Sequence, residues 1–378
     1  MAVGRDPRIA VVAPWLRGGA SRSALLHAQT LAATGAQLEL VGVRADDARL
    51  PSGPNVRAWE LDEPVRPGEA APHLGPLLER VLAAGPLDLL HAHYAFPFGE
   101  VAAGGVEGGT NANQVGAFVL SLHGTDVTRA LQAKELANRL RGMCRRAACT
   151  TTPSRHLAQE LRRGTGCTSR VWGGAVDLER FRPGPTRRGP LRVVSASGFA
   201  PWKRAPRLVR AFALALERCG SRGEGAELVL LGEGVERARA ASLARELGLG
   251  SRVRLPGAVD APERVLRSCD LMASAAAEES FGLALLEGLA CGLPLVATRV
   301  GGVAEWVGRG PHARLVPADD MDALATALAD CLARPREMRS LRTAARTRAE
   351  AHGLERWRAR MDALYRPWID LATTPPRS

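Results

Sequence analysis

Short apolar runs alternate along the whole chain with longer segments in which apolar residues recur every three or four positions. Residues 9–13, 38–43 and 191–196 have the length and aliphatic content of buried strands. Residues 21–34 and 206–218 have the spacing of amphipathic helices. This alternation predicts parallel sheets joined by crossover helices, and so an α/β fold.

Each half of the chain continues the alternation. Further strands are predicted in the first half at 87–91 and 118–122, and in the second half at 227–231 and 253–255. A further helix is predicted at 235–247. Two segments lack periodicity: residues 52–76, rich in Pro, Gly and charge, predict a surface loop, and glycine-rich residues 101–113 predict a mobile segment.

The Pro- and Gly-rich run at residues 183–190 is the clearest linker in the sequence. A chain of 378 residues with 46% apolar content is also too long for one compact core. We therefore predict a first domain at residues 1–183, a second at 184–357, and a C-terminal helix at 358–378 that belongs with the first.

Composition narrows the class of protein. The net charge of +12 raises nucleic acid as a partner, but the arginines are spread along the chain and no nucleic-acid motif is present in the sequence. Seven scattered cysteines without a C-x-x-C pair indicate reduced thiols. No apolar run is long enough to span a bilayer, and the N-terminus lacks the pattern of a signal peptide, which together predict a cytoplasmic protein.

Residues 279–287, E-S-F-G-L-A-L-L-E, carry the strongest functional signal. Glu279 precedes a helical pattern, and Glu287 falls two turns into it. Backbone N–H groups at the helix start, near Phe281, Gly282 and Leu283, suit a phosphate or a polyhydroxyl ligand. The alternative is an ordinary buried helix with two solvated or capping acids.

This window continues into G-L-P-L-V-A-T at 292–298 and G-G-V-A-E at 301–305. The whole stretch resembles the donor-binding signature of the family-4 glycosyltransferases, with Ser280 where that family usually has Gly. The resemblance implies the GT-B architecture, in which two Rossmann-like domains face a cleft. It also implies a retaining, metal-independent transfer of a hexose or N-acetylhexosamine from a nucleotide-diphosphate sugar, with UDP the most frequent nucleotide.

The same resemblance assigns further donor residues. Lys203, in S-G-F-A-P-W-K-R, matches a lysine that contacts the donor diphosphate, where a cation can replace a metal. Arg204 is the candidate to replace the family's arginine, since Gly198 occupies that position. Gly18 and Gly19 match the N-terminal glycine loop at the phosphates, and Gly232 matches a turn beside the nucleoside. Glu279 is expected to grip the sugar and Glu287 the ribose.

On the acceptor side, S-L-H-G-T-D-V at 121–127 resembles the family's H-G-x-D segment. It implies that His123 lies near the transferred sugar and that Asp126 orients the loop or the acceptor. His93, in H-A-H-Y, follows a strand end on the same side. A metal site at His91, His93 and His123 is disfavoured, because no carboxylate joins them at a ligand spacing. The other five histidines are read as structural or surface residues: His27, His73, His156, His312 and His352.

We therefore expect a hexosyltransferase that uses no metal or other cofactor and whose partners are a nucleotide sugar and a hydroxyl-bearing acceptor. The class of acceptor stays open. The basic helix at 131–148 favours a solvated face over membrane contact. Three alternatives remain: an epimerase or hydrolase on the same fold, a non-catalytic sugar-nucleotide-binding protein, and, on charge alone, a nucleic-acid-binding protein.

Overall fold

The structure is a computed structural model that describes residues 6–15, 19–43, 50–61, 63, 65–66, 68–107 and 114–373. The chain divides into two compact units. One comprises Met1–Gly173 together with Trp357–Ser378, and the other comprises Gly174–Arg356. The division therefore falls ahead of the linker at residues 183–190 on which the sequence placed the boundary.

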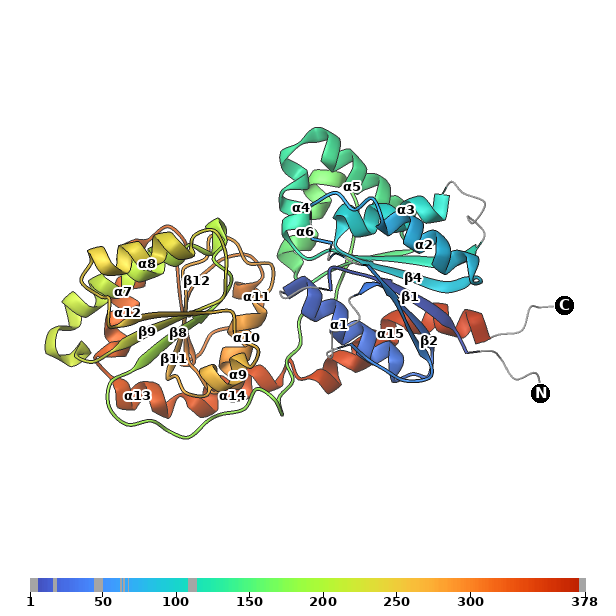
Figure 1. Ribbon diagram of the computed structural model, residues 1–378. Helices are drawn as coiled ribbons and strands as arrows, with labels where there is room; N and C mark the ends of the chain where they lie inside the picture. The colour runs from blue at the N-terminus through green and yellow to red at the C-terminus, as the bar shows by residue number, and fades with distance from the viewer. Residues whose placement is uncertain are drawn as a thin grey trace. The chain divides into compact units, whose positions relative to one another are not determined.

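A parallel sheet forms the centre of the first unit (Figure 1). Among the described residues its strand order is β3-β2-β1-β4-β5-β6-β7. The order reverses between β1 and β4, and in open α/β sheets ligands bind outside the carboxyl ends of the strands at such a point. The strands are β1 Arg8–Val12, β2 Gln37–Val43, β3 Val56–Glu60, β4 Leu87–His93, β5 Val115–Ser121, β6 Cys149–Thr152 and β7 Arg170–Val171.

Helices cover both faces of this sheet. Figure 1 shows α1 and α15 on one side and α2 and α3 on the other. Buried aliphatic side chains of the strands and of α2 form one continuous core. The helical elements are α1 Gly19–Ala32, α2 Leu74–Ala83, η1 Ala95–Gly99, α3 Glu100–Glu107, α4 Thr125–Thr128, η3 Ala130–Gln132, α5 Lys134–Arg146, α6 Arg155–Thr165 and α15 Leu354–Thr373.

The prediction of a surface loop over residues 52–76 is wrong for β3 and for the start of α2. β3 pairs with β2 at the edge of the sheet, so only one of its sides is hydrogen-bonded. Its side chains are mostly exposed or half-buried, with Trp59 buried. An edge strand with one buried residue has no continuous apolar run to reveal it.

Part of the glycine-rich segment at 101–113 is also ordered, because residues up to Glu107 form α3. Here glycine serves close packing: a Cβ on Gly105 would lie 3.3 Å from Leu78 Cδ2 on α2. Residues 108–113 lie outside the described residues.

The second unit repeats the same plan. Its parallel sheet, over the described residues, has the order β10-β9-β8-β11-β12-β13, with the reversal between β8 and β11. The strands are β8 Arg192–Ala196, β9 Glu227–Leu231, β10 Val253–Gly257, β11 Leu271–Ser274, β12 Leu295–Thr298 and β13 Ala313–Val316. The helical elements are η4 Pro201–Lys203, α7 Ala205–Cys219, η5 Gly220–Gly223, α8 Arg237–Glu246, α9 Pro262–Leu266, α10 Leu283–Ala290, α11 Val303–Val307, α12 Met321–Leu332, α13 Pro335–Ser340 and α14 Arg342–Glu350.

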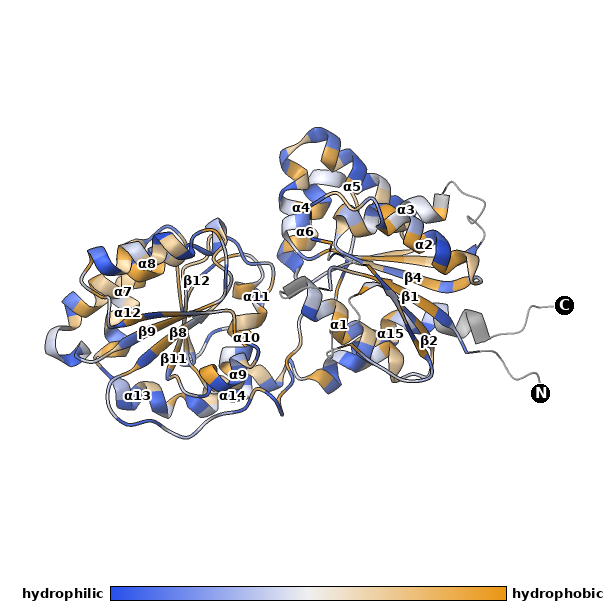
Figure 2. Cartoon of the chain, viewed as in Figure 1, coloured by the Kyte–Doolittle hydropathy of each residue, from blue (hydrophilic) through white to orange (hydrophobic). Residues whose placement is uncertain are grey.

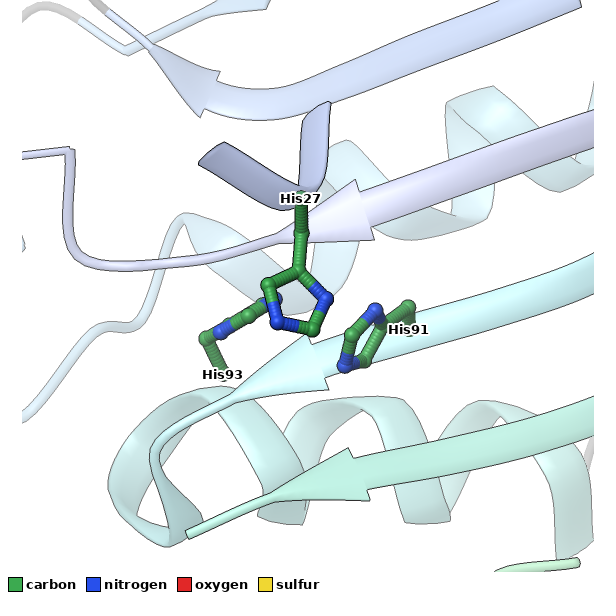
Figure 3. Close-up of side chains that lie close together, drawn as sticks. All are labelled: His27, His91 and His93. Carbon is green, nitrogen blue, oxygen red and sulfur yellow. The ribbon is translucent and has the colours of Figure 1, made fainter. Parts of the chain in front are cut away.

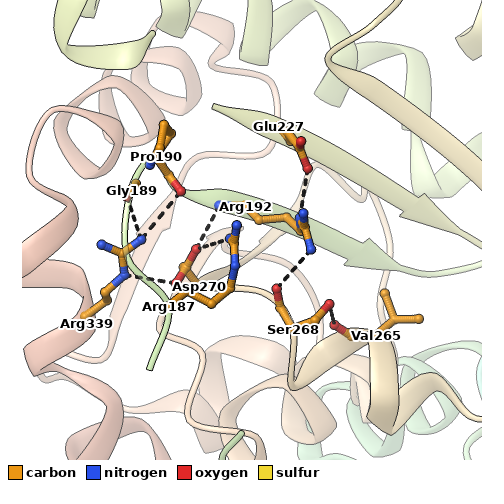
Figure 4. Close-up of polar contacts among 9 residues, drawn as sticks. All are labelled: Arg187, Gly189, Pro190, Arg192, Glu227, Val265, Ser268, Asp270 and Arg339. Carbon is orange, nitrogen blue, oxygen red and sulfur yellow. Dashed lines mark hydrogen bonds and ion pairs between the residues drawn. The ribbon is translucent and has the colours of Figure 1, made fainter. Parts of the chain in front are cut away.

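The Pro- and Gly-rich run at 183–190 is fastened inside the second unit (Figure 4). Arg187 Nη1 donates to Asp270 Oδ2 at 2.7 Å, and Arg339 Nε donates to Asp270 Oδ1 at 3.1 Å. Arg339 Nη2 also donates to the Gly189 carbonyl at 2.8 Å. The Asp270 side chain is 0% exposed. Residues 183–190 have the composition of a flexible linker, but they form an ordered segment that is held by a buried carboxylate. We call this segment the strap.

Hydrophobic residues recur along the strands, and the helices carry both hydrophobic and hydrophilic residues (Figure 2). Two buried clusters line the two faces of the second sheet. Among the described residues, no helix combines the length and the apolar content needed to cross a membrane.

Candidate functional site

Lys203 and Glu279 meet where the second sheet reverses its order. Lys203 ends η4, which follows β8, and Glu279 lies in the loop after β11. Lys203 Nζ donates to Glu279 Oε2, and the two side chains are 19% and 20% exposed. The structure thus brings together the cation and the acid that the sequence assigned to the diphosphate and the sugar.

The loop that carries Glu279 is fixed through its backbone. The Gly302 N–H donates to the Glu279 carbonyl at 3.0 Å, and the Ala277 N–H donates to the Trp202 carbonyl at 2.7 Å. A Cβ on Gly301 would lie 2.1 Å from the Glu279 carbonyl oxygen, so only glycine fits there. Three loops at the carboxyl ends of β8, β11 and β12 therefore hold one another in place.

The start of α10 is shaped by Phe281 and Gly282. Phe281 is buried and stacks on Trp306, with ring centroids 5.2 Å apart. Gly282 has φ +88, a conformation that L side chains rarely adopt, and α10 begins at the next residue, Leu283. The sequence prediction of a loop followed by a helix is confirmed here.

Glu287 lies in α10 and is only 5% exposed. Because the helix begins at Leu283, Glu287 lies about one turn into it, and the prediction of two turns is wrong. The error arose because the apolar spacing does not mark where the glycine turn ends.

Two further donor candidates are near the Lys203 loop. Gly232, with φ +123, follows β9, and a Cβ there would lie 2.6 Å from the Ser197 carbonyl oxygen. Arg204 donates from Nη1 to Asp319 Oδ1 at 2.7 Å and to the Ala318 carbonyl at 3.2 Å. The Arg204 guanidinium is therefore held by the β13–α12 connection, whereas Lys203 pairs with Glu279. Gly18 lies outside the described residues, and Gly19 is the first residue of α1.

In the first unit, His93 and His123 lie at the carboxyl ends of neighbouring parallel strands. His93 ends β4, and its Nδ1 lies 3.1 Å from His123 Nε2. Burial lowers the pKa of His123 to about 3. Burial, and then repulsion from neighbouring histidines, holds the pKa of His93 well below its usual range. Both rings are therefore neutral, and His93, with 0% exposure, supports His123 from behind.

The Asp126 side chain stabilises the loop that contains His123. Its buried carboxylate accepts backbone N–H bonds from His123 at 3.0 Å and Gly124 at 2.8 Å, and from Val127 and Ala95 at 3.1 Å each. Burial raises the pKa of Asp126 to about 6, and these backbone donors act in the opposite direction. These contacts show that Asp126 holds the loop, and its other predicted role, orienting the acceptor, stays a prediction.

Sequence reasoning missed the contribution of both tyrosines. The Tyr365 hydroxyl, on α15, bonds to His91 Nδ1 at 2.7 Å and to His27 Nδ1. Tyr94 has φ 78, and its ring stacks on His123 with centroids 6.4 Å apart. The available signal was their rarity, because the chain contains only 2 tyrosines.

Three histidines could together hold a metal among the residues that the structure describes: His27, His91 and His93 (Figure 3). His27 therefore takes the place that His123 had in the triad that the sequence considered. His27 lies on the buried face of α1 with Ala24, Ala28 and Leu31, which is why its spacing indicated a structural residue.

Two family models match the two halves of the chain. Residues 17–180 match "Glycosyltransferase Family 4" and residues 178–348 match "Glycosyl transferases group 1". N-acetyl-alpha-D-glucosaminyl L-malate synthase of Bacillus anthracis is 29% identical over 253 residues, which are 63% of this chain and 64% of that protein. D-inositol 3-phosphate glycosyltransferase of Saccharomonospora viridis is 37% identical over 207 residues, 50% of this chain and 47% of that protein. These matches span less than two thirds of the relatives' lengths.

Solved structures share the fold over nearly the whole chain. Sucrose-phosphate synthase from Thermosynechococcus elongatus has a TM-score of 0.79 at 22% identity, covering 97% of this chain and all of that one. Anabaena HepE in complex with UDP and glucose has a TM-score of 0.75 at 19% identity, covering 96% of this chain and all of that one.

Two parallel-sheet Rossmann-like units, with a paired lysine and acid ahead of a glycine-started helix, define a protein of the GT-B class. The two family models together span residues 17–348. The chain belongs to the family-4 glycosyltransferases.

Proposed function

We propose that the chain transfers a hexose or N-acetylhexosamine from a nucleotide-diphosphate sugar, UDP-linked, to an acceptor hydroxyl. The transfer retains the anomeric configuration and needs no metal at the diphosphate. The observation that carries the proposal is the Lys203–Glu279 pair, partly exposed beside the start of α10 at the reversal point of the second sheet.

Lys203 acts on the leaving group. As the glycosidic bond breaks, negative charge grows on the diphosphate, and a preorganised ammonium group lowers the energy of that state. In the structure the Lys203 ammonium group is paired with Glu279. The donor's diphosphate replaces the carboxylate at Lys203, and Glu279 is then free to accept hydrogen bonds from the sugar hydroxyls.

The start of α10 holds the rest of the donor. The turn from Phe281 to Leu283 is rigid because the Phe281 ring stacks on Trp306 and its carbonyl accepts from Trp306 Nε1. We assign the sugar to this backbone. Glu287, one turn further along the helix, takes the ribose hydroxyls. Gly232 leaves room for the nucleoside.

The acceptor step is assigned to the front face of the sugar. A covalent double displacement needs a carboxylate that is free to attack the anomeric carbon. Asp126, the only carboxylate in the His123 segment, is committed to backbone N–H groups. The leaving phosphate oxygen therefore takes the acceptor proton, with neutral His123 beside the sugar. A glycosyl adduct trapped on Asp126 would overturn this step.

UDP is supported by a structure of the same fold that holds UDP and glucose. The names of the two relatives, N-acetyl-alpha-D-glucosaminyl L-malate synthase and D-inositol 3-phosphate glycosyltransferase, support a sugar donor but name no nucleotide. GDP-linked sugars are the alternative, and the donor test distinguishes the two nucleotides.

The test is a thermal-shift panel of UDP- and GDP-sugars on the wild type, Lys203→Ala and Glu287→Ala. Binding to the folded chain alone raises its melting temperature by mass action. We expect a UDP-sugar response that both variants lose and that Lys134→Ala, which removes the chain's other lysine on the exposed side of α5, keeps. No response to any nucleotide sugar, or an equal response in all variants, would refute the assignment. Donor turnover without an acceptor would favour the epimerase or hydrolase.

A further inference from the structure

Three buried histidines of the first unit lie close together (Figure 3). His27 comes from α1, and His91 and His93 come from β4. All three are 0% exposed, and one nitrogen from each lies within 4.8 Å of the others. The ring centroids are 4.2 to 5.0 Å apart.

Each of the three rings has at least one nitrogen with a hydrogen-bond partner. His27 Nδ1 bonds to the Tyr365 hydroxyl, and His93 Nδ1 lies 3.1 Å from His123 Nε2. His91 Nε2 lies 2.8 Å from Ser121 Oγ. Metal-binding histidines show this arrangement, in which the second ring nitrogen is held by a neighbour that fixes the tautomer and the ring orientation.

Two of the remaining ring nitrogens lack a hydrogen-bond partner in the part of the chain that the structure describes. His27 Nε2 and His93 Nε2 are buried without a hydrogen-bond partner among the described residues. A buried polar atom left unpaired costs about 1–3 kcal/mol, so such atoms normally have a ligand or a water. Both nitrogens of His91 have partners, Ser121 Oγ at Nε2 and the Tyr365 hydroxyl at Nδ1, so an ion bound to His91 would replace one of them.

We propose that His27, His91 and His93, with one ring nitrogen each, form a binding site for a divalent ion of the late first-row transition metals, such as Zn²⁺. Three imidazoles and no carboxylate suit this class of ion and do not suit Mg²⁺ or Ca²⁺, which prefer oxygen. Metal–nitrogen bonds of about 2.0–2.1 Å require ligand atoms roughly 3.4 Å apart. Because the three nitrogens lie within 4.8 Å of one another, no pair must approach by more than roughly 1.4 Å.

A bound ion would join α1 to β4 and stiffen two neighbours of the site. The ion would bind one nitrogen of His93, while His93 Nδ1 keeps its contact with His123 Nε2 and so orients the His123 ring. Tyr365 would keep its bond to His27 and so fasten α15. This role is structural and separate from the proposed transfer, which needs no metal at the diphosphate.

The test is titration of the chelator-treated full chain with Zn²⁺ and Co²⁺. We expect one equivalent of Zn²⁺ to bind and to raise the melting temperature. We expect Co²⁺ to give the d–d absorption of a nitrogen site without the thiolate charge-transfer band that the chain's cysteines would produce. His27→Gln and His91→Gln should weaken binding at least about a hundredfold. His73→Gln, a change at an exposed histidine on another surface, should leave it unchanged.

Three results would overturn the site: no Zn²⁺ bound by the wild type, a thiolate band with Co²⁺, or equal affinity in His27→Gln and the wild type. The first two concern the wild type alone and stand even if a variant fails to fold. The absence of binding would assign His27 Nε2 and His93 Nε2 to a buried water. None of these outcomes bears on donor binding, which is measured separately.

Discussion

At the scale of single residues, the donor site depends on a few backbone positions that place charged side chains. Lys203 and Glu279 come from different loops, and their pairing requires that the Glu279 backbone stays close to Gly301 and Gly302. The side-chain charges supply the chemistry, whereas the glycines decide where the charges lie.

Gly301→Ala tests this dependence. Its φ of +46 and the 2.1 Å approach of a Cβ to the Glu279 carbonyl force the loop to move. We expect a loss of about 2 kcal/mol or more in the free energy of unfolding, and loss of the nucleotide-sugar response. The matched control is Gly104→Ala in α3, where a Cβ meets nothing within 4 Å, and which should stabilise the chain by about 0.4–1 kcal/mol. Equal effects of the two substitutions on denaturant unfolding would contradict this reading.

The sequence could predict the donor residues because they lie close together along the chain and form one signature from Glu279 to Glu305. The histidine cluster could not be predicted in the same way. His27, His91 and Tyr365 are hundreds of positions apart at the extremes, and each alone has the pattern of a core residue. Only the fold shows that they meet.

At the scale of elements, buried strands and amphipathic helices were predicted because each shows its own period. The second unit's first three strands and α7 and α8 follow the sequence prediction within a few residues. The sequence did not reveal β3, because an edge strand need not be apolar. The strap at 183–190 was predicted to be an interdomain linker, because Pro and Gly are common both in flexible linkers and in ordered loops.

Asp270→Asn tests how the strap is fastened. The carboxylate is 0% exposed and pairs with Arg187 and Arg339, which are 26% and 11% exposed. Removing one partner of a buried pair leaves charge uncompensated, so we expect a loss of about 3 kcal/mol in denaturant unfolding. Asp330→Asn, whose pair with Arg314 is half-exposed, should cost under about 1 kcal/mol. A loss at Asp270 no larger than this would show that the strap does not depend on the carboxylate.

Tyr365→Phe tests how α15 is attached to the first unit. Its hydroxyl bonds to His27 Nδ1 and His91 Nδ1, all of them buried. Its loss leaves two ring nitrogens unpaired, which should lower the free energy of unfolding by about 2–4 kcal/mol in chelator-treated protein. Arg366→Ala, the next and exposed position on α15, serves as the control. An unchanged stability of Tyr365→Phe would mean that packing alone holds the helix.

At the scale of the whole molecule, each unit has its own parallel sheet and core, and the proposed chemistry is divided between them. In the second unit, the charged side chains of Lys203 and Glu279 form an ion pair. In the first unit, burial keeps the histidine rings neutral. This contrast predicts different responses of the two units to acid.

Acid should destabilise the first unit selectively. Burial lowers the pKa of His91 and of His123 from 6.5 to about 3. Between about pH 6.5 and 3, these histidines bind protons in the unfolded chain but not in the folded chain. The free energy of unfolding therefore falls as the pH drops through this range. Each such group contributes a slope of up to about 1.4 kcal/mol per pH unit. Unfolding of metal-free protein at several pH values measures this slope, and His91→Asn should reduce it. A stability that is flat or rises on acidification would contradict the neutral cluster.

A crystal structure of the chain with UDP would show whether a nucleotide-diphosphate sugar binds at Lys203 and the start of α10. We expect the diphosphate within hydrogen-bonding distance of Lys203 Nζ, the ribose hydroxyls on Glu287, and Glu279 turned away from the lysine toward the sugar position. UDP bound elsewhere, or bound with the Lys203–Glu279 pair intact, would contradict this expectation.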